Sequence, residues 1–198
     1  MGKRILIGID EVGRGALAGP LVVAALAKTG RVRLASHRLG KIRDSKRLTK
    51  KRREEWFSYL TTHPGIAWRA ARVSPAVIDR INISRAANAA ACRLVKRFYA
   101  ARCFALLDGG LKLPDSVPHR TIIKGDERLP LIAAASIIAK VFRDRLMASL
   151  HRKFPAYGFK IHKGYATRLH KRMISRYGPS EVHRKTFLTW LANAKIKK

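Results

Sequence analysis

Short apolar runs alternate along the first 150 residues with longer stretches in which apolar side chains recur every three or four positions. The short runs predict β-strands, which we place at 4–9, 21–27, 66–73, 103–107 and 121–123. The longer stretches predict helices at 50–60, 83–99 and 130–150, the last with Pro130 in its first turn. Strands that alternate with helices are typical of an α/β core.

The character of the sequence changes near residue 150. From 151 onward it is polar and basic, and we expect it to be helical. The pattern therefore predicts a core over 1–150 and a small helical C-terminal extension over 151–198, without a sharp boundary between them.

Charge narrows the class of partner. The 198 residues include 43 Lys and Arg against 12 Asp and Glu, a formal net charge of +31, and 47% of residues are apolar. That apolar content can form a core, which excludes a disordered basic tail. A surface this basic attracts polyanions, so nucleic acid is the first candidate and an anionic membrane surface the second.

The positive charge is concentrated in two segments. Residues 31–53 carry eleven Lys and Arg against one acid, and residues 147–198 carry thirteen against one. We expect both segments to flank a functional site and to grip phosphates without sequence preference.

The two cysteines indicate the compartment. Cys92 and Cys103 form no CxxC pair and cannot build a disulfide framework, which favours a reducing cytoplasm. Since no stretch approaches the ~20 apolar residues of a membrane span, we expect no membrane insertion.

The acids are few, and some of them share a context. Asp10 with Glu11, Asp108 and Asp126 each follow an apolar run. Strand ends are where site residues gather in α/β sheets, and carboxylates brought together there repel one another unless a cation lies between them. Carboxylate oxygens select Mg²⁺ or Mn²⁺, and two such ions about 3.5–4 Å apart are the usual machinery for cutting a phosphodiester. Turn formation would also account for Asp108 and Asp126, because Asp-Gly and Gly-Asp favour turns.

Five ordered blocks of sequence resemble one known family. They are GIDEVGRGALAGPLVVAA, DSKRLT, LLDGG, KGDERLPLIAAASIIAKVFRD and YGFKIHKGYATRLH, which span positions 8 to 170. In this order they resemble bacterial ribonuclease HII, the type 2 ribonuclease H. The resemblance implies a ribonuclease H-like fold, in which a mixed five-stranded sheet is flanked by helices and followed by a helical extension. It also implies hydrolysis of RNA in RNA/DNA hybrids and incision on the 5′ side of single ribonucleotides in duplex DNA, leaving 5′-phosphate and 3′-hydroxyl ends.

The resemblance assigns roles to individual residues. The family's four metal-binding carboxylates fall on the acids already singled out: Asp10, Glu11, Asp108 and Asp126. The family's GRG turn falls on Gly13, Arg14 and Gly15, where the backbone could approach a 2′-hydroxyl and the arginine could reach phosphates. Without the resemblance, an ordinary tight turn would account for the same three residues.

Four further residues are candidates for substrate binding. Tyr165 matches the family's junction-sensing tyrosine, which would stack on the sugar that lacks a 2′-hydroxyl; alone, it would be an ordinary core or surface aromatic residue. Lys46 resembles a residue near substrate phosphate. Ser136 and Lys140 are four residues apart on an otherwise apolar helix, so they share one face and could reach a polar site or simply the chain behind it.

Two positions depart from the family pattern. Many relatives have Asn in place of Gly110 and Ser in place of Glu127, although neither change removes a ligand. The histidines at 162, 170 and 183 fit solvated surface positions better than phosphate contacts. A non-catalytic basic module that binds RNA or DNA is the competing hypothesis, and it gives no reason for acids at strand ends. We expect a monomer.

Overall fold

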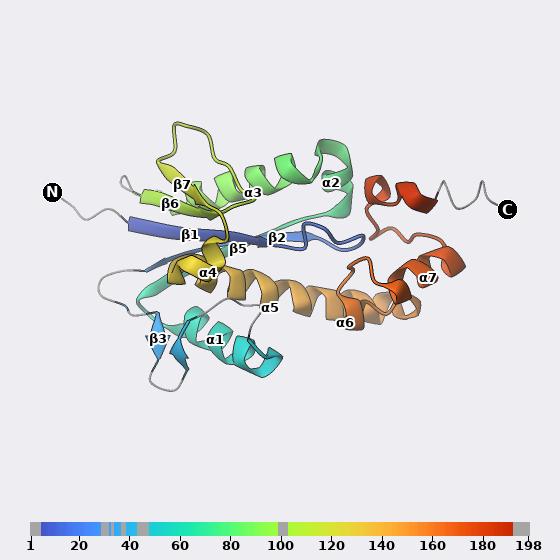
Figure 1. The fold of residues 1–198 in the computed structure, drawn as a ribbon, viewed down its shortest axis with the longest axis horizontal. Coiled ribbons are helices and arrows are strands. Elements are labelled where there is room, and N and C mark those ends of the chain that lie inside the picture. Colours follow the sequence, from blue (N-terminus) through green and yellow to red (C-terminus); the bar gives the residue numbers. More distant parts are fainter. Residues whose placement is uncertain are drawn as a thin grey trace.

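The computed structural model describes residues 5–28, 32, 34–36, 39–42, 48–98 and 103–191. Lys46 lies outside these residues. A five-stranded sheet forms the centre, in the order β5-β2-β1-β6-β7 (Figure 1). Its strands are β1 (Ile5–Val12), β2 (Leu21–Lys28), β5 (Ile66–Val73), β6 (Cys103–Asp108) and β7 (His119–Ile122).

The sheet is mixed because it contains both antiparallel and parallel pairs of strands. Strands β1, β2 and β5 follow one another antiparallel, whereas β6 lies parallel to β1 and β7 parallel to β6. The predicted mixed five-stranded α/β sheet is therefore confirmed. A separate two-stranded ribbon joins β3 (Ala35–Ser36) to β4 (Gly40–Lys41).

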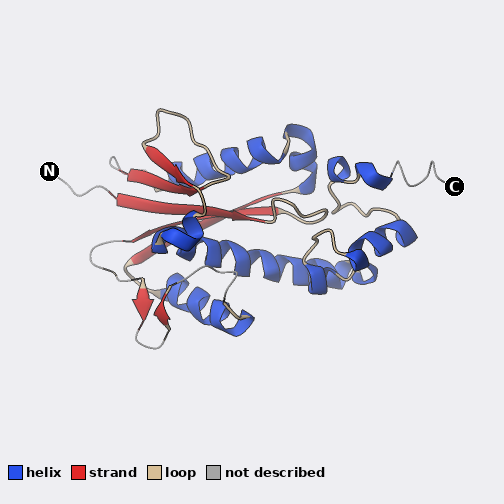
Figure 2. Cartoon of the chain, in the orientation of Figure 1, coloured by secondary structure: helices blue, strands red, loops and turns tan. Residues whose placement is uncertain are grey.

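Helices cover both faces of the sheet (Figure 2). Alternate residues of the strands enter two apolar clusters, because successive side chains of a strand point to opposite faces. Ile9 and Val23 pack with α3 (Ile83–Arg97), beside which lies α2 (Pro75–Ile81). Val22 and Ala24 pack with α5 (Pro130–Lys153) and α1 (Lys50–Thr62). No helix in the described ranges is long and apolar enough to cross a membrane.

One position in β1 sets how closely α5 approaches the sheet. A Cβ atom added to Gly8 would lie 2.3 Å from the carbonyl oxygen of Leu131, in the first turn of α5. The absence of a side chain at Gly8 therefore lets the helix start directly against the central strand.

The elements differ from the sequence predictions at several ends. Strand β1 continues to Val12 rather than ending at Ile9, because Asp10 and Glu11 still pair with Ala24 and Val23 of β2. The last strand is His119–Ile122, which begins and ends earlier than the predicted 121–123. Helices α1 and α5 extend to Thr62 and Lys153, and helix α2 lies in a stretch where the pattern predicts none.

The remainder of the described chain is helical, as the sequence predicts. It contains the 3₁₀ helices η1 (Pro155–Tyr157) and η2 (Lys185–Phe187), with α6 (Phe159–His162) and α7 (Arg168–Tyr177) between them. A third apolar cluster joins Leu17 to Phe159 and Ile174. Backbone hydrogen bonds from Leu17 and Ala18 to the Gly164 carbonyl attach this part to the loop that follows β1.

Candidate active site

The site lies where β1 and the parallel strand β6 end together. Their register pairs Gly8 with Leu106 and Ile9 with Leu107, so Asp10 and Asp108 follow at neighbouring positions. Asp108 is the last residue of β6, whereas Asp10 and Glu11 lie within β1. The topology thus brings together three of the four predicted carboxylates from distant parts of the sequence.

Asp10 is almost fully buried, at 4% exposure. Its Oδ1 atom accepts a hydrogen bond from the Glu11 backbone N–H at 2.7 Å. Burial raises the pKa of Asp10 well above its ordinary value, and the Glu11 and Asp108 carboxylates raise it further, against a hydrogen bond from the Ser136 side chain. Ser136 therefore reaches the polar site from α5 rather than only the chain behind it, the other possibility for its position on the helix.

Glu11 is partly neutralised by Arg14. The arginine Nη1 atom donates to Oε1 of Glu11 at 3.2 Å, while Oε2 is buried without a hydrogen-bond partner in the described part of the chain. Burial raises the pKa of Glu11, Arg14 opposes this rise, and Asp108 adds to it. A buried carboxylate oxygen without a donor is costly unless a cation satisfies it.

Asp108 and Asp126 are linked through a turn. Lys124 has a left-handed conformation (φ 54°) and leads into the short helix α4 (Gly125–Arg128). The Gly125 N–H then donates to Oδ1 of Asp108 at 2.7 Å. Asp126 follows on this helix and is buried, at 3% exposure. It thus lies on a helix, whereas the sequence pattern predicts a strand end.

The donor set fits a hard divalent cation. The Asp108 carboxylate is close enough to raise the pKa of both Asp10 and Glu11, and one Glu11 oxygen lacks a partner among the described residues. Within the same residues, however, no three His, Cys, Asp or Glu side chains form a ready metal-binding group. The assignment of all four carboxylates as metal ligands therefore stays a prediction.

The GRG turn has two glycines with different surroundings. Gly13 has φ +91°, and a Cβ there would lie 2.1 Å from Nε of Arg143, so the fold itself requires glycine. Gly15 is exposed, has no left-handed φ, and a Cβ there would meet nothing within 4 Å. The fold gives no reason for glycine at position 15.

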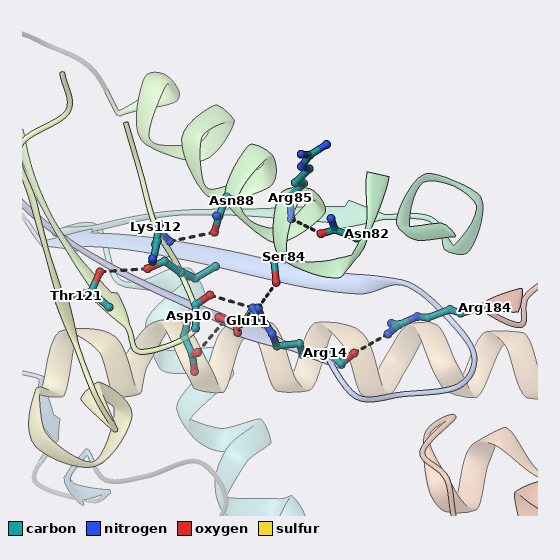
Figure 3. A network of polar contacts seen from close by, with 12 residues as sticks. Asp10, Glu11, Arg14, Asn82, Ser84, Arg85, Asn88, Lys112, Thr121 and Arg184 are labelled. Carbon is teal, nitrogen blue, oxygen red and sulfur yellow. Dashed lines mark hydrogen bonds and ion pairs between the residues drawn. The ribbon is translucent and has the colours of Figure 1, made fainter. Parts of the chain in front are cut away.

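Arg14 contacts the protein rather than open solvent alone (Figure 3). Besides Glu11, it donates to the Gly110 carbonyl at 2.9 Å and to Oγ of Ser84 at 2.7 Å. A Cβ at Gly110 would lie 2.5 Å from Oε1 of Glu11, so this departure from the family makes room for the Glu11–Arg14 pair. Sequence reasoning does not identify Ser84, which carries no motif of its own.

The loop after Asp108 is fixed by two polar side chains that sequence reasoning also misses. Oδ1 of Asn88 accepts from the Lys112 N–H at 3.0 Å, and the Thr121 hydroxyl donates to the Leu111 carbonyl at 3.1 Å (Figure 3). Both come from neighbouring elements, α3 and β7, so only the tertiary structure reveals them.

Two other predicted substrate residues make their own contacts outside the carboxylate cluster. Tyr165 is half-buried, and Cζ of Arg143 lies 5.3 Å from the centre of its ring. Lys140 forms an ion pair with Asp144 at 2.8 Å, one helical turn along α5. Its ammonium group is thus engaged by an acid outside the predicted carboxylate site.

The three C-terminal histidines are buried, which corrects the prediction of solvated surface positions. His162, His170 and His183 have exposures of 7%, 0% and 2%, and the centres of the first two rings stack 4.2 Å apart. Burial lowers the pKa of His170 and of His183 to about 4, so both rings are neutral at pH 7. They fill space between the C-terminal helices, which a basic local sequence does not reveal.

Their hydrogen bonds define which nitrogens carry protons. The Ser180 N–H donates to Nδ1 of His183 at 2.9 Å, so the His183 proton lies on Nε2. The His183 Nε2–H donates to Nε2 of His170, with 3.1 Å between the two nitrogens. The His170 proton therefore lies on Nδ1, which donates to the Tyr165 carbonyl oxygen at 2.9 Å. A chain of hydrogen bonds from Ser180 through His183 and His170 thus holds the backbone carbonyl of Tyr165.

Comparison with known proteins identifies the family of the chain. The family model described as Ribonuclease HII matches residues 7–190. The ribonuclease HII of Geotalea daltonii is 43% identical over 186 residues, covering 94% of this chain and 83% of that protein. The ribonuclease HII of Chlamydia caviae is 42% identical over 187 residues, covering 94% and 85%.

A solved structure supports the same conclusion. Ribonuclease HII from Archaeoglobus fulgidus, determined in complex with PCNA, superposes with a TM-score of 0.74 at 30% identity, covering 91% of this chain and 94% of that one. The sheet order, the carboxylates at the ends of β1 and β6, and these matches over nearly the whole length lead to one assignment: the chain belongs to the ribonuclease HII family and is a ribonuclease H-type hydrolase.

Proposed function

We propose that this ribonuclease hydrolyses RNA in RNA/DNA hybrids and also incises duplex DNA on the 5′ side of a single ribonucleotide, leaving 5′-phosphate and 3′-hydroxyl ends. The observation that carries the proposal is the exposed Gly15, four residues after Glu11 in the turn that follows the strand with the buried Asp10. Because Gly15 has no side chain, its backbone can approach a 2′-hydroxyl close to the carboxylates that would hold the metal ions.

In this proposal Asp10, Glu11, Asp108 and Asp126 hold two divalent ions, Mg²⁺ or Mn²⁺. Such ions supply an activated water and stabilise the charge on the leaving oxygen. Ser136 orients Asp10 through its hydrogen bond, and the Gly125 N–H orients Asp108. Arg14 keeps Glu11 from rotating away, and 35% of its side-chain surface stays exposed toward a phosphate.

Tyr165 would distinguish the two sides of a junction. A flat ring packs well against a deoxyribose, whereas the 2′-hydroxyl of a ribose would crowd it. Gly15 and Tyr165 would then read opposite features of adjacent sugars. Lys46, Lys140 and the exposed arginines would contact phosphates and add affinity without sequence preference.

We further propose that the enzyme acts as a cytoplasmic monomer. The cysteines support the compartment, because Cys92 and Cys103 are free thiols and Cys103 is buried in the core. The competing module without catalytic activity does not account for three neighbouring carboxylates, two of which, Asp10 and Glu11, have a pKa raised by burial and by the nearby Asp108.

The test uses duplex DNA that carries one ribonucleotide, with Mg²⁺ or Mn²⁺. We expect a single nick on the 5′ side of the ribonucleotide. Asp108→Asn should slow the nick about 100- to 1000-fold with unchanged binding, because the amide can still accept from the Gly125 N–H but binds a cation poorly. The exposed Asp115→Asn is the matched control and should cleave normally. Normal binding by the wild-type protein without a nick would contradict the proposal.

A further inference from the structure

Two arginines, Arg143 and Arg184, are completely buried, at 0% exposure. Within the described part of the chain, every hydrogen bond of their guanidinium groups goes to a backbone carbonyl, and neither arginine forms an ion pair. Burial lowers the pKa of both groups, because it removes them from water. A buried cation without a carboxylate partner destabilises a fold unless its N–H donors are hydrogen-bonded. The backbone carbonyls that accept from each arginine therefore indicate which segments it holds in place.

Arg143 joins two segments that are far apart in the sequence. Its Nε and Nη2 atoms donate to the carbonyls of Pro20 and Ala18, at 2.9 and 3.2 Å, in the loop that follows the GRG turn. Its Nη1 atom donates to the Lys163 carbonyl at 2.9 Å, two residues before Tyr165.

The same guanidinium also contacts both predicted substrate elements. Its Cζ atom lies 5.3 Å from the centre of the Tyr165 ring, at a distance where a cation attracts an aromatic face. It also occupies the space that a side chain at Gly13 would need. One rigid, planar group therefore contacts both the turn that would read the ribose and the ring that would read the next sugar.

Arg184 differs in one respect. It donates to the carbonyls of Arg14 and Gly19, at 2.9 Å and at 3.0 to 3.2 Å, and its Cζ lies 5.3 Å from the ring of Phe187. These bonds hold the GRG loop, whereas the bond to the segment before Tyr165 comes from Arg143. Arg184 is a matched comparison, equally buried and bound to the same loop.

We propose that Arg143 is a positioning residue that sets the spacing between the Gly13–Gly15 turn and Tyr165, and so determines how strongly the enzyme favours a junction over a continuous hybrid. The inference rests on the proposed roles of the turn and of Tyr165. A continuous hybrid offers a 2′-hydroxyl at every position of its RNA strand, so it depends less on this spacing than a single ribonucleotide does. Lysine cannot replace arginine here, because an ammonium group lacks the planar fork that reaches three carbonyls at once.

The experiment compares Arg143→Lys with Arg184→Lys on two substrates. The substrates are duplex DNA with one ribonucleotide and a uniform RNA/DNA hybrid, and kcat/KM is measured on each. We expect Arg143→Lys to reduce junction cleavage ~10- to 100-fold more than hybrid cleavage, since a displacement of about 1 Å can cost 100-fold in rate. Arg184→Lys should reduce both rates by a similar factor. Equal losses on both substrates in Arg143→Lys would overturn the proposal.

A second measurement does not depend on cleavage. In protein labelled with fluorotyrosine, Tyr165→Phe identifies the ¹⁹F signal of Tyr165. Arg143→Lys, or Arg143→Gln if the lysine variant does not fold, should shift that signal, whereas Arg145→Lys, on the same helix but paired with Glu54, should leave it in place. An unmoved signal would overturn the positioning role. If the wild-type protein does not cut the junction substrate but the signal moves, the proposed function fails while the link between Arg143 and Tyr165 stands.

Discussion

Asp10 and Glu11 are neighbours in the sequence but lie in different surroundings. Because side chains alternate along a strand, Asp10 faces α5 and meets Ser136, whereas Glu11 shares the other face with Ile7 and Ile9 and meets Arg14. The sequence alone indicates these acids, since two adjacent carboxylates beside an apolar run are unusual. It cannot indicate Arg143 or Arg184, which are two among 43 basic residues and are distinguished by their burial.

At the scale of the residue, a substitution at Gly15 should affect cleavage without affecting stability. Gly15→Ala should leave the free energy of unfolding within about 1 kcal/mol of wild type, since a Cβ there meets nothing within 4 Å. It should nevertheless lower junction cleavage ~10-fold or more, because the methyl group would keep the backbone away from the 2′-hydroxyl. Denaturant unfolding and single-turnover cleavage measure the two effects.

Gly8→Ala is the contrasting variant. Its Cβ would lie 2.3 Å from the Leu131 carbonyl oxygen, so it should lose about 1–3 kcal/mol of stability through overpacking. Unchanged cleavage by Gly15→Ala would contradict the role assigned to that glycine.

The elements are predictable where the apolar pattern is strong. Strand β2 is a continuous buried run and helix α3 buries residues at helical spacing, and both lie close to their predicted ranges. Helix α2 escapes prediction because it has only seven residues, although Ser74 followed by Pro75 is a helix-start signal. The turn into α4 is not predictable, since it depends on a left-handed lysine at position 124. Nor does a local pattern indicate that Asp79 of α2 accepts hydrogen bonds from the backbone N–H groups of Lys185 and Thr186, more than 100 residues later.

The helices after residue 154 should lose stability in acid. The pKa of both His170 and His183 is lowered from 6.5 to about 4, so the native state binds fewer protons than the unfolded state between these values. Stability is therefore fully present above pH 6.5 and falls as the pH drops toward 4, by up to about 1.4 kcal/mol per pH unit for each histidine. Protonation would also make both Nε2 atoms, of His170 and of His183, hydrogen-bond donors, so the hydrogen bond between them would be lost.

Unfolding by urea at a series of pH values measures this dependence. His183→Asn removes one of the two titrating groups, and the Asn side-chain oxygen can still accept from the Ser180 N–H. We expect a shallower fall between pH 6.5 and 4 in this variant. A fall as steep as in the wild-type protein would show that other groups cause it.

At the scale of the whole molecule, charge and chemistry are separated. The net charge of +31 is carried mainly on the surface, and α7 shows the arrangement: His170 and Ile174 are buried, whereas Arg168, Lys171 and Arg172 are exposed. The two buried acids, Asp10 and Asp126, lie in β1 and on α4, and the half-buried Asp108 ends β6 beside them. Under the proposed function the basic surface would provide affinity, and the carboxylates would hold the metal ions that cleave.

Affinity should depend steeply on salt. If six to ten phosphates are contacted, binding should weaken ~10³- to 10⁵-fold between 50 and 200 mM salt, because each contact releases condensed counterions. Fluorescence anisotropy should give nearly the same slope for duplex DNA with and without a ribonucleotide, since phosphate contacts carry no sequence information. A slope near zero would mean that the basic surface does not hold the substrate.

The hydrogen bonds from Arg184 to the loop after β1 join positions up to 170 residues apart, and this separation has a consequence for the growing polypeptide. During translation β1 and β2 emerge first, but Asp108 and Asp126 follow only after half of the chain has been made. Arg184 arrives later still and completes the support of the GRG turn. If the basic surface and the four carboxylates act as proposed, a nascent chain would bind RNA before its cutting centre is complete. Nuclease activity would then begin only when synthesis is almost finished.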